Sequence, residues 1–221
     1  MVFLKATTSA GSSDPIHLRI LTVLMEARVH IVNIVTFDDS SRYMVDVGFG
    51  GDGATKPIPL LEDHRIRNIG TQDIRLTRDY IPGQTERTPE RKLWIYQYRN
   101  SPDKPWNSFY AFSDLVEFLW PDYDIMNWYT GSSPESFQTF TVLVVKFLRR
   151  RNPERADEDE IYGKRMLVNR TVKENLGGKT QVVKECKTEE ERVQALRHWF
   201  GIELTPEEKD SIIGFGTELS E

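Results

Sequence analysis

The amino-acid sequence predicts an α+β fold, in which an antiparallel β-barrel is followed by a small α/β layer that serves as a lid. Short β-branched and aromatic runs broken by turn residues fill residues 30–119. Strand and helix patterns alternate over residues 120–221, and two helix-capping sequences stand near the end of the chain. We therefore expect a barrel domain (30–119), a lid domain (120–221) and a short N-terminal remnant (1–29).

The first elements are a helix and a hairpin. Residues 16–29, IHLRILTVLMEARV, carry apolar side chains at a spacing that predicts a short amphipathic helix. The next two runs, HIVNIVTF and RYMVDVGF, are β-branched and alternating, and the DDSS between them is typical of a turn. These runs predict a hairpin whose strands carry His30 and Asp46. An imidazole and a carboxylate are therefore expected to lie close together.

Residues 56–112 continue as short strands. The runs KPIPLLED, IRLTRDYIPGQT, KLWIYQYRN and WNSFYAF are separated by turn residues, a density typical of a barrel or a strongly curved antiparallel sheet. The runs SDLVEFL and DYDIMNWYT then have a helical pattern. Their clustered aromatic residues favour a role in the core over contacts to a cofactor.

The last hundred residues predict strands followed by two capped helices. FQTFTVLVVKFLRR predicts a long strand, and KRMLVNRTVKENLGGKTQVVKEC predicts two strands joined across Gly177 and Gly178. Thr188 and Glu191 form a capping box, and a second box with proline at the first helical position begins at Thr205. We expect the first of these helices to pack its apolar side inward.

The composition argues against several classes of function. A net charge of −5 disfavours non-specific nucleic-acid binding, and the basic run over residues 146–155 favours a solvated strand end over an anion site. No run of 18 apolar residues occurs, and the first residues lack the apolar core of a signal peptide. The single cysteine, Cys186, cannot form an internal disulfide. These features predict a cytoplasmic protein without a membrane span.

Asp46 is the residue that most requires an explanation. It lies in YMVDVGFGG, a strand pattern that runs into a glycine-rich loop, where an unpaired carboxylate is strongly unfavourable. Beside His30 it can fix the tautomer of the ring and stabilise the imidazolium, which makes two members of a nucleophilic triad. Taken alone, such a pair is structural at least as often as catalytic. No metal site is predicted, because the chain has no HExxH motif and no cysteine pair.

Several stretches resemble one enzyme family in the same order along the chain. HIVNIV and YMVDVGFGG are similar to the histidine and aspartate segments of the arylamine N-acetyltransferases. KPIPL, LWIYQYR, WNSFYAFSD, MNWYTGSSPESF and EERVQALRHWFGIEL resemble later segments, so the resemblance runs from about His30 to Leu204. It implies a transglutaminase- and cysteine-protease-like architecture. It also implies a Cys-His-Asp triad that transfers an acetyl group from acetyl-coenzyme A to a small aromatic amine or hydrazine.

The resemblance also implies roles for single residues. His30 is the base of the triad, Asp46 orients it, and Phe49 lines the acceptor pocket. Read from the residues alone, MNWYTGSSPESF would be a loop between a helix and a strand. The resemblance implies that three of its positions contact coenzyme A: Tyr129, Ser133 and Ser136.

The nucleophile of the family has no counterpart in these residues. The family carries an RGG-x-C type segment with the acetylated cysteine, and none of the 29 residues before His30 is a cysteine. We therefore expect a truncated member of the family in which apolar strand residues such as Ile31, Ile34 and Val45 lack partners. Cys186 stands just before a predicted helix N-terminus, which can lower the pKa of a thiol. The resemblance nevertheless places it outside the active site.

Two functions follow from these observations. The first is acyl transfer in ping-pong order through a Cys-His-Asp triad, with no metal. The second is a catalytically inactive homologue that binds coenzyme A or interacts with another protein. The missing cysteine favours the second for this chain, whereas His30, Asp46 and Phe49 favour the first for the family. We assign the family activity and expect the chain alone to be inactive.

Overall fold

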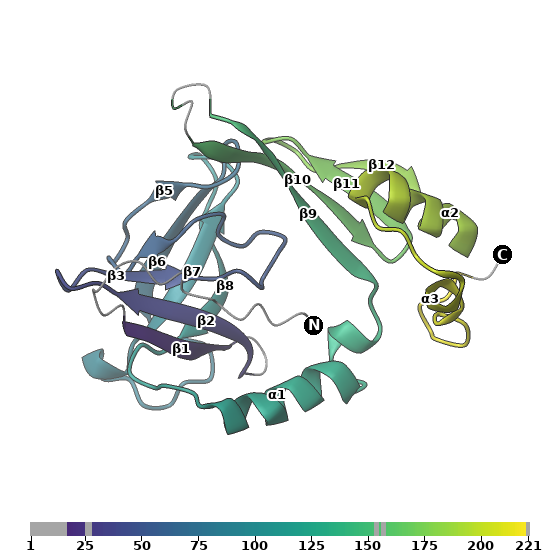
Figure 1. Cartoon of the computed structure of the whole chain (residues 1–221). Coiled ribbons are helices and arrows are strands. Elements are labelled where there is room, and N and C mark those ends of the chain that lie inside the picture. The colour runs from purple at the N-terminus through teal and green to yellow at the C-terminus, as the bar shows by residue number, and fades with distance from the viewer. Residues whose placement is uncertain (1–16, 25–27, 153–154, 156–157, 220–221) are drawn as a thin grey trace.

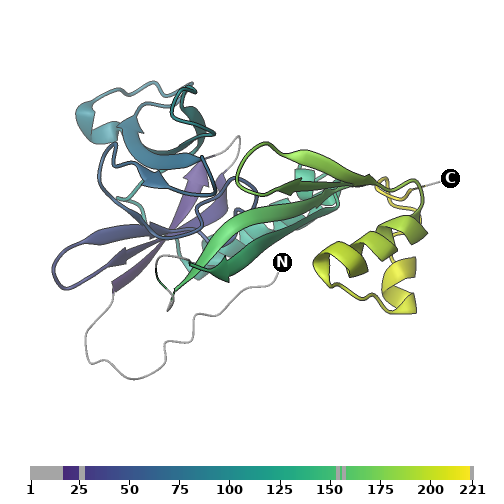
Figure 2. The same cartoon turned by 90° about the horizontal axis from the view of Figure 1, so that it is seen from above.

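The protein forms two antiparallel sheets, of eight and four strands, in a computed structural model that describes residues 17–24, 28–152, 155 and 158–219. The larger sheet curves strongly, and helix α1 runs along its lower side in Figure 1. The smaller sheet lies beside it and carries the C-terminal helices at its far end (Figure 2). The larger sheet has the order β4-β3-β2-β1-β8-β7-β6-β5, with these bounds: β1 (His17–Leu24), β2 (Arg28–Thr36), β3 (Arg42–Val45), β4 (Ile58–Pro59), β5 (Ile66–Arg67), β6 (Asp73–Asp79), β7 (Leu93–Arg99) and β8 (Asn107–Phe112).

The larger sheet is open rather than closed. Strands β4 and β5 stand at its two ends and do not pair with each other in the described residues. Each has only two residues, which is too short for a ladder that would close the sheet; a single bridge joins Glu62, between them in sequence, to Leu76 on β6. The prediction of a closed β-barrel was therefore wrong, and the alternative of a strongly curved antiparallel sheet is confirmed.

The predicted hairpin of β2 and β3 is confirmed. The two strands pair antiparallel with Asn33 opposite Val45. Alternate residues of the hairpin, among them Val32, Ile34 and Met44, are fully buried in the core of the larger sheet. The expectation that Ile34 lacks partners was thus wrong, because the curvature of the sheet encloses that face.

Residues 17–24 form a strand where a helix was expected. Strand β1 pairs along its length with β2 and, at Val23 and Leu24, with β8. The apolar spacing of this stretch fits a helix, but eight residues make a marginal helix, and pairing with two neighbouring strands satisfies the backbone more fully. Of the other residues of the expected helix, 16 and 25–27 lie outside the described residues, and 28 and 29 are the first two residues of β2.

The smaller sheet has one strand more than the sequence indicated. Its order is β12-β11-β10-β9, with these bounds: β9 (Leu143–Arg151), β10 (Asp159–Val168), β11 (Thr171–Asn175) and β12 (Gln181–Glu185). The turn at Gly177 joins β11 to β12 as predicted. A second tight turn at Asn169, whose φ is +51°, splits the first predicted strand into β10 and β11. Asparagine tolerates this left-handed conformation, so Asn169 was the sequence signal for a turn that was not predicted.

Helix α1 begins later than the sequence pattern suggested. It spans Trp120–Ser132, and the SDLVEFL run before it is irregular. Pro121 explains the start, because proline is tolerated in the first turn of a helix but not in its interior. In the described residues, the short 3₁₀ helices η1 (Pro89–Arg91) and η2 (Phe137–Thr139) lie in the connections between these elements.

The C-terminal helices begin at the predicted caps. Helix α2 (Glu189–Ala195) starts where the Thr188 hydroxyl accepts a hydrogen bond from the Glu191 amide, and it continues as one π-helical turn, η3 (Leu196–Phe200). Helix α3 (Pro206–Asp210) has the full reciprocal capping box at Thr205. Both predictions of helix starts are therefore confirmed.

Each sheet has its own core. The smaller sheet packs Leu167 and Val172 against Cys186 and the apolar side of α2 and η3.

The division of the chain into domains 1–29, 30–119 and 120–221 stays a prediction. No helix in the described ranges is long and apolar enough to cross a bilayer.

Candidate active site

His30 and Asp46 meet at the hairpin of β2 and β3. His30 lies near the start of β2, and Asp46 directly follows the end of β3. The ring nitrogen Nε2 of His30 stands 3.0 Å from both carboxylate oxygens of Asp46. The contact between these two side chains, expected from the hairpin, is thus present.

Asp46 is a buried carboxylate with a full set of donors. Its side chain has 0% exposure. Oδ1 accepts from the backbone amides of Gly48 (3.2 Å) and Phe49 (3.1 Å), and Oδ2 accepts from the hydroxyl of Tyr110 (2.7 Å). Because His30 adds a fourth donor, the negative charge is stabilised without a cation, and the carboxylate holds one orientation.

This arrangement sets the proton positions on His30. A carboxylate accepts only, so the Nε2 atom that faces it carries the hydrogen, and Nδ1 of the neutral ring has the free lone pair. The described residues provide no hydrogen-bond partner for Nδ1, and the side chain is 18% exposed. The ring can therefore take a proton from a group that approaches Nδ1, while Asp46 stabilises the imidazolium.

A cluster of aromatic rings surrounds the pair. The ring of Phe49 packs edge-on against His30, with 5.2 Å between centroids, and against Phe109, with 4.6 Å. Tyr110 is stacked on Tyr96 with centroids 5.0 Å apart. The contacts of Phe49 and Tyr110 with His30 restrict the position of the imidazole.

Tyr110 is a site residue that the sequence did not reveal. Burial, followed by the negative charge of Asp46, raises the pKa of Tyr110 well above its ordinary value, so the phenol stays protonated and donates. Its position in β8, 64 residues from Asp46, gives no local pattern that links the two. An aromatic residue in a predicted strand was the only available signal.

The residues expected to contact coenzyme A lie at the end of α1 and beyond. Tyr129 is half-buried in the last turns of the helix, and Ser133 is its C-cap. Ser136 is buried, and its hydroxyl donates to the carbonyl of Thr130 at 2.8 Å. The Ser136 hydroxyl therefore stabilises this turn. Helix α1 contacts strand β2, which carries His30.

Cys186 does not belong to this cluster. It is fully buried in the core of the smaller sheet, among Leu167, Val172 and Ala195. Burial raises the pKa of its thiol, which disfavours the reactive thiolate. Its position and its environment both argue against a role as the partner of His30.

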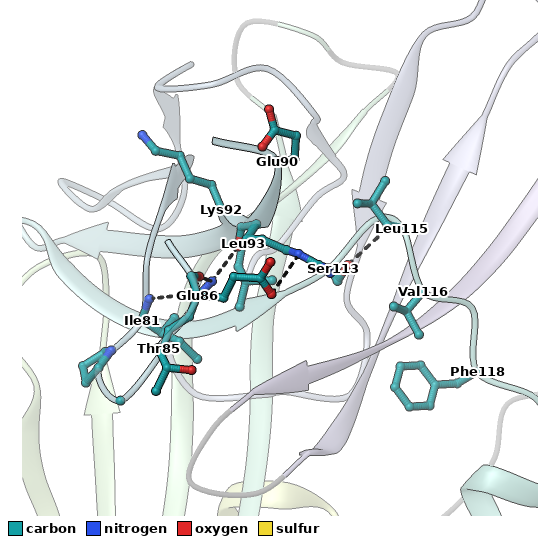
Figure 3. A pocket seen from close by; sticks show the side chains of 14 residues that line it. Ile81, Thr85, Glu86, Glu90, Lys92, Leu93, Ser113, Leu115, Val116 and Phe118 are labelled. Atoms are coloured by element: carbon teal, nitrogen blue, oxygen red, sulfur yellow. Dashed lines mark hydrogen bonds and ion pairs between the residues drawn. The ribbon is translucent and has the colours of Figure 1, made fainter. Parts of the chain in front are cut away.

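A separate open pocket of about 540 Å³ lies elsewhere on the larger sheet. The connection between β6 and β7 forms one wall, and Leu115, Val116 and Phe118 line the other (Figure 3). None of the predicted site residues lines it. Within the part of the chain that the structure describes, no group of three or more His, Cys, Asp or Glu residues is placed to hold a metal ion.

The chain is similar to known acyltransferases in sequence. A family model described as N-acetyltransferase matches residues 21–209. The N-malonyltransferase FDB2 of Fusarium pseudograminearum is 37% identical over 189 residues, which are 83% of this chain and 53% of that protein. The FDB2 protein of Gibberella moniliformis is 34% identical over 190 residues, 83% of this chain and 52% of that protein. The chain thus spans about half the length of the curated relatives it matches.

Solved structures show the same fold. The arylamine N-acetyltransferase of Salmonella typhimurium aligns with a TM-score of 0.65 and 21% identity, over 89% of this chain and 68% of that one. The Mycobacterium marinum enzyme in complex with CoA aligns with a TM-score of 0.65 and 20% identity, over 85% of this chain and 63% of that one. Since the family model covers most of the sequence and the folds agree, the chain belongs to the arylamine N-acetyltransferase family.

Proposed function

We propose that this chain carries the base half of an N-acyltransferase site, which moves an acyl group from acyl-coenzyme A to an amine through a cysteine thioester. The observation that carries the proposal is the contact of His30 Nε2 with a buried, fully hydrogen-bonded Asp46, which leaves Nδ1 as the base. The proposal requires a cysteine thiol at Nδ1 of His30, and Cys186 does not supply it, because it is buried in the other core.

The chemistry assigns four proton transfers to His30, two in each half of the reaction. Nδ1 takes the thiol proton as the thiolate attacks the acyl carbonyl, and the imidazolium then protonates the departing sulfur of coenzyme A. In the second half, the amine attacks the enzyme thioester, His30 takes a proton from the amine nitrogen, and the imidazolium returns a proton to the departing cysteine sulfur, which regenerates the thiol. Asp46 stabilises the imidazolium in both halves.

The proposed substrates are supported by the family and by the names of its relatives. An aromatic amine or hydrazine is the proposed acceptor, and acetyl-coenzyme A is the donor implied by the solved members. The curated relatives carry the name N-malonyltransferase, so malonyl-coenzyme A is the second donor to compare. Phe49, edge-on to His30, is the proposed wall of the acceptor pocket, and Tyr129 and Ser133 are the proposed contacts to coenzyme A. Ser136 contributes by holding the same turn.

The test is an acyl-transfer assay with both donors and an aromatic amine. We expect turnover from the polypeptide expressed from the complete coding sequence, and its loss in the His30→Gln variant. We expect no turnover from the 221-residue chain alone. Turnover of that chain that disappears in Cys186→Ala would overturn the assignment of the nucleophile.

A second function is favoured by the same burial of Cys186. On this alternative the protein binds coenzyme A without turnover. Calorimetry with coenzyme A separates the two. Binding by the product of the complete coding sequence, together with no transfer to any amine, would favour the binding protein over the enzyme.

A further inference from the structure

A buried lysine of the smaller sheet reaches the loop that holds Asp46. Lys164 on β10 is 3% exposed. Its ammonium donates to the carbonyl of Gly51 at 2.6 Å and to the carboxylate of Asp52 at 2.7 Å. Lysine is rarely buried unless it is paired. The charge of Lys164 is therefore matched by the aspartate loop, which we define as residues 46–53.

The aspartate loop depends on support from outside. Gly50 and Gly51 have φ values of +64° and +45°, and glycine loses more conformational freedom on folding than other residues do. One backbone hydrogen bond, from Gly53 to Gly50, closes a turn within the described loop. Two further internal bonds, from the Gly48 and Phe49 amides to Asp46, fix only the start of the loop, so residues 50–53 keep one shape only where neighbouring groups hold them.

Neutral groups of the larger sheet supply part of this support. The Tyr96 hydroxyl donates to the carbonyl of Asp52 at 2.7 Å, and the Gln72 amide donates to the Asp52 carboxylate at 3.2 Å. The Asn68 amide donates to the carbonyl of Gly53. Among the donors from other elements that contact the described loop, the charged one is Lys164, which lies on the smaller sheet. A hydrogen bond from a charged donor is about twice as strong as a neutral one.

The first residues of the aspartate loop hold His30 and Asp46 in position. The amides of Gly48 and Phe49 donate to Asp46, and the Phe49 ring packs on His30. We propose that Lys164 is a positioning residue for His30: by fixing Gly51 and Asp52 it holds the aspartate loop, whose amides and ring orient Asp46 and the imidazole. The importance of Lys164 for catalysis rests on the proposed acyl transfer, whereas its effect on the geometry of His30 does not.

The test compares Lys164→Met with Lys184→Met in the full chain. Methionine keeps most of the length of the lysine side chain and removes the charge. Lys184 is the matched control, because it lies on β12 of the same sheet and pairs with Glu191 at 3.3 Å. NMR measures two signals that do not depend on catalytic activity. They are the ring resonances of His30 and the hydrogen exchange of the Gly48 and Phe49 amides.

In Lys164→Met we expect the exchange of both amides to rise by about tenfold or more, which corresponds to ~1.4 kcal/mol of local stability. We also expect the His30 ring resonances to shift. Amides in the core strands β6 and β7 should keep their exchange rates, and Lys184→Met should leave all these signals in place. Unchanged His30 resonances and amide exchange in a folded Lys164→Met chain would overturn the proposal, whatever the acyl-transfer assay shows.

A second variant covers the case in which Lys164→Met does not fold. Asp52→Asn keeps the shape of the loop and removes the charge that the ammonium faces, so the same two signals should change in the same direction. If they do not, the ion pair does not position the site. In the polypeptide that turns over acyl-coenzyme A, Lys164→Met should lower kcat while KM for the donor stays within about twofold, because positioning acts on the reacting groups.

Discussion

The carboxylate of Asp46 can be buried because four hydrogen-bond donors surround it. His30, the amides of Gly48 and Phe49, and the phenol of Tyr110 all point at the two carboxylate oxygens. A hydrogen bond to a charged group contributes about 1.5–3 kcal/mol, so the set offsets the cost of burial. The carboxylate is thereby fixed, and the tautomer of His30 follows from it.

The phenol of Tyr110 should matter for stability as well as for orientation. Tyr110→Phe removes one donor from Asp46 and leaves a buried oxygen with fewer partners. We expect the free energy of unfolding at pH 7 to fall by about 1–3 kcal/mol, measured by urea denaturation. Tyr162→Phe on β10, a half-buried tyrosine of the other sheet, is the control and should change stability little.

The same phenol gives stability a dependence on high pH. Burial raises the folded-state pKa of Tyr110 above its ordinary value of about 10, so its contribution is complete below pH ~10 and is lost as the pH rises above it. We expect unfolding experiments between pH 9 and about 11 to show falling stability, and a shallower fall in Tyr110→Phe. An equal slope in both proteins would show that Tyr110 does not stay protonated in the folded state.

Local sequence revealed only part of this site. His30 and Asp46 could be predicted because a five-residue connection joins their strands, so that neighbouring sequence sets their pairing. Tyr110 and Lys164 could not, since they reach the site across the sheet and from the second sheet. Their contacts depend on tertiary packing, which a single sequence does not encode in any short pattern.

The same distinction holds for whole elements. Helices α2 and α3 were predicted well, because capping hydroxyls at Thr188 and Thr205 act within one turn. Strand β1 was mistaken for a helix, since its partners β2 and β8 decide its conformation. The closure of the sheet was also mispredicted, because it depends on the short edge strands β4 and β5 rather than on strand density.

A contact of two glycines joins the two sheets and makes a sharp prediction. A Cβ atom on Gly70, whose φ is +55°, would overlap the backbone of Gly177 in the turn between β11 and β12. The amide of Thr71 also donates to the Gly177 carbonyl there. Gly70→Ala should cost about 1–2 kcal/mol for the left-handed backbone and about 1–3 kcal/mol more for the overlap, measured by urea denaturation.

The control for this variant is Gly83→Ala. Gly83 also has a positive φ of +79°, but a Cβ atom there meets no atom within 4 Å. It should therefore cost only the backbone contribution, about 1–2 kcal/mol. Equal losses in the two variants would show that the contact of the two turns does not contribute to stability.

At the scale of the molecule, exposed apolar side chains gather on α1 and its N-cap. Leu119, Trp120, Ile125 and Trp128 are each between 62% and 73% exposed. Ile125 and Trp128 stand three residues apart and are neighbours on the helix surface. Large apolar surface of this kind favours association with another surface. The shortage of apolar partners was expected on strand residues such as Ile34, which is buried, and the exposure of α1 was not predicted.

We expect the purified chain to self-associate at micromolar concentration in sedimentation velocity. Ile125→Lys with Trp128→Lys should shift it toward the monomer without a change in circular dichroism. Leu61→Lys with Val182→Lys adds the same charges at exposed apolar positions elsewhere and should leave association as it was. A wild-type chain that is monomeric under these conditions would refute this role of α1.

The central claim is that Asp46 orients His30 as a general base for a thiol. The one cysteine of the chain, Cys186, does not supply that thiol. The most direct measurement supplies that thiol. The 221-residue chain is mixed with acetyl- or malonyl-coenzyme A and 2-mercaptoethanol, and the S-acylated thiol is measured by mass spectrometry against a protein-free control. We predict a rate above that control that falls by about 10²-fold or more in His30→Gln and Asp46→Asn, the size of general-base catalysis. Equal rates for the wild-type chain and His30→Gln would contradict the account.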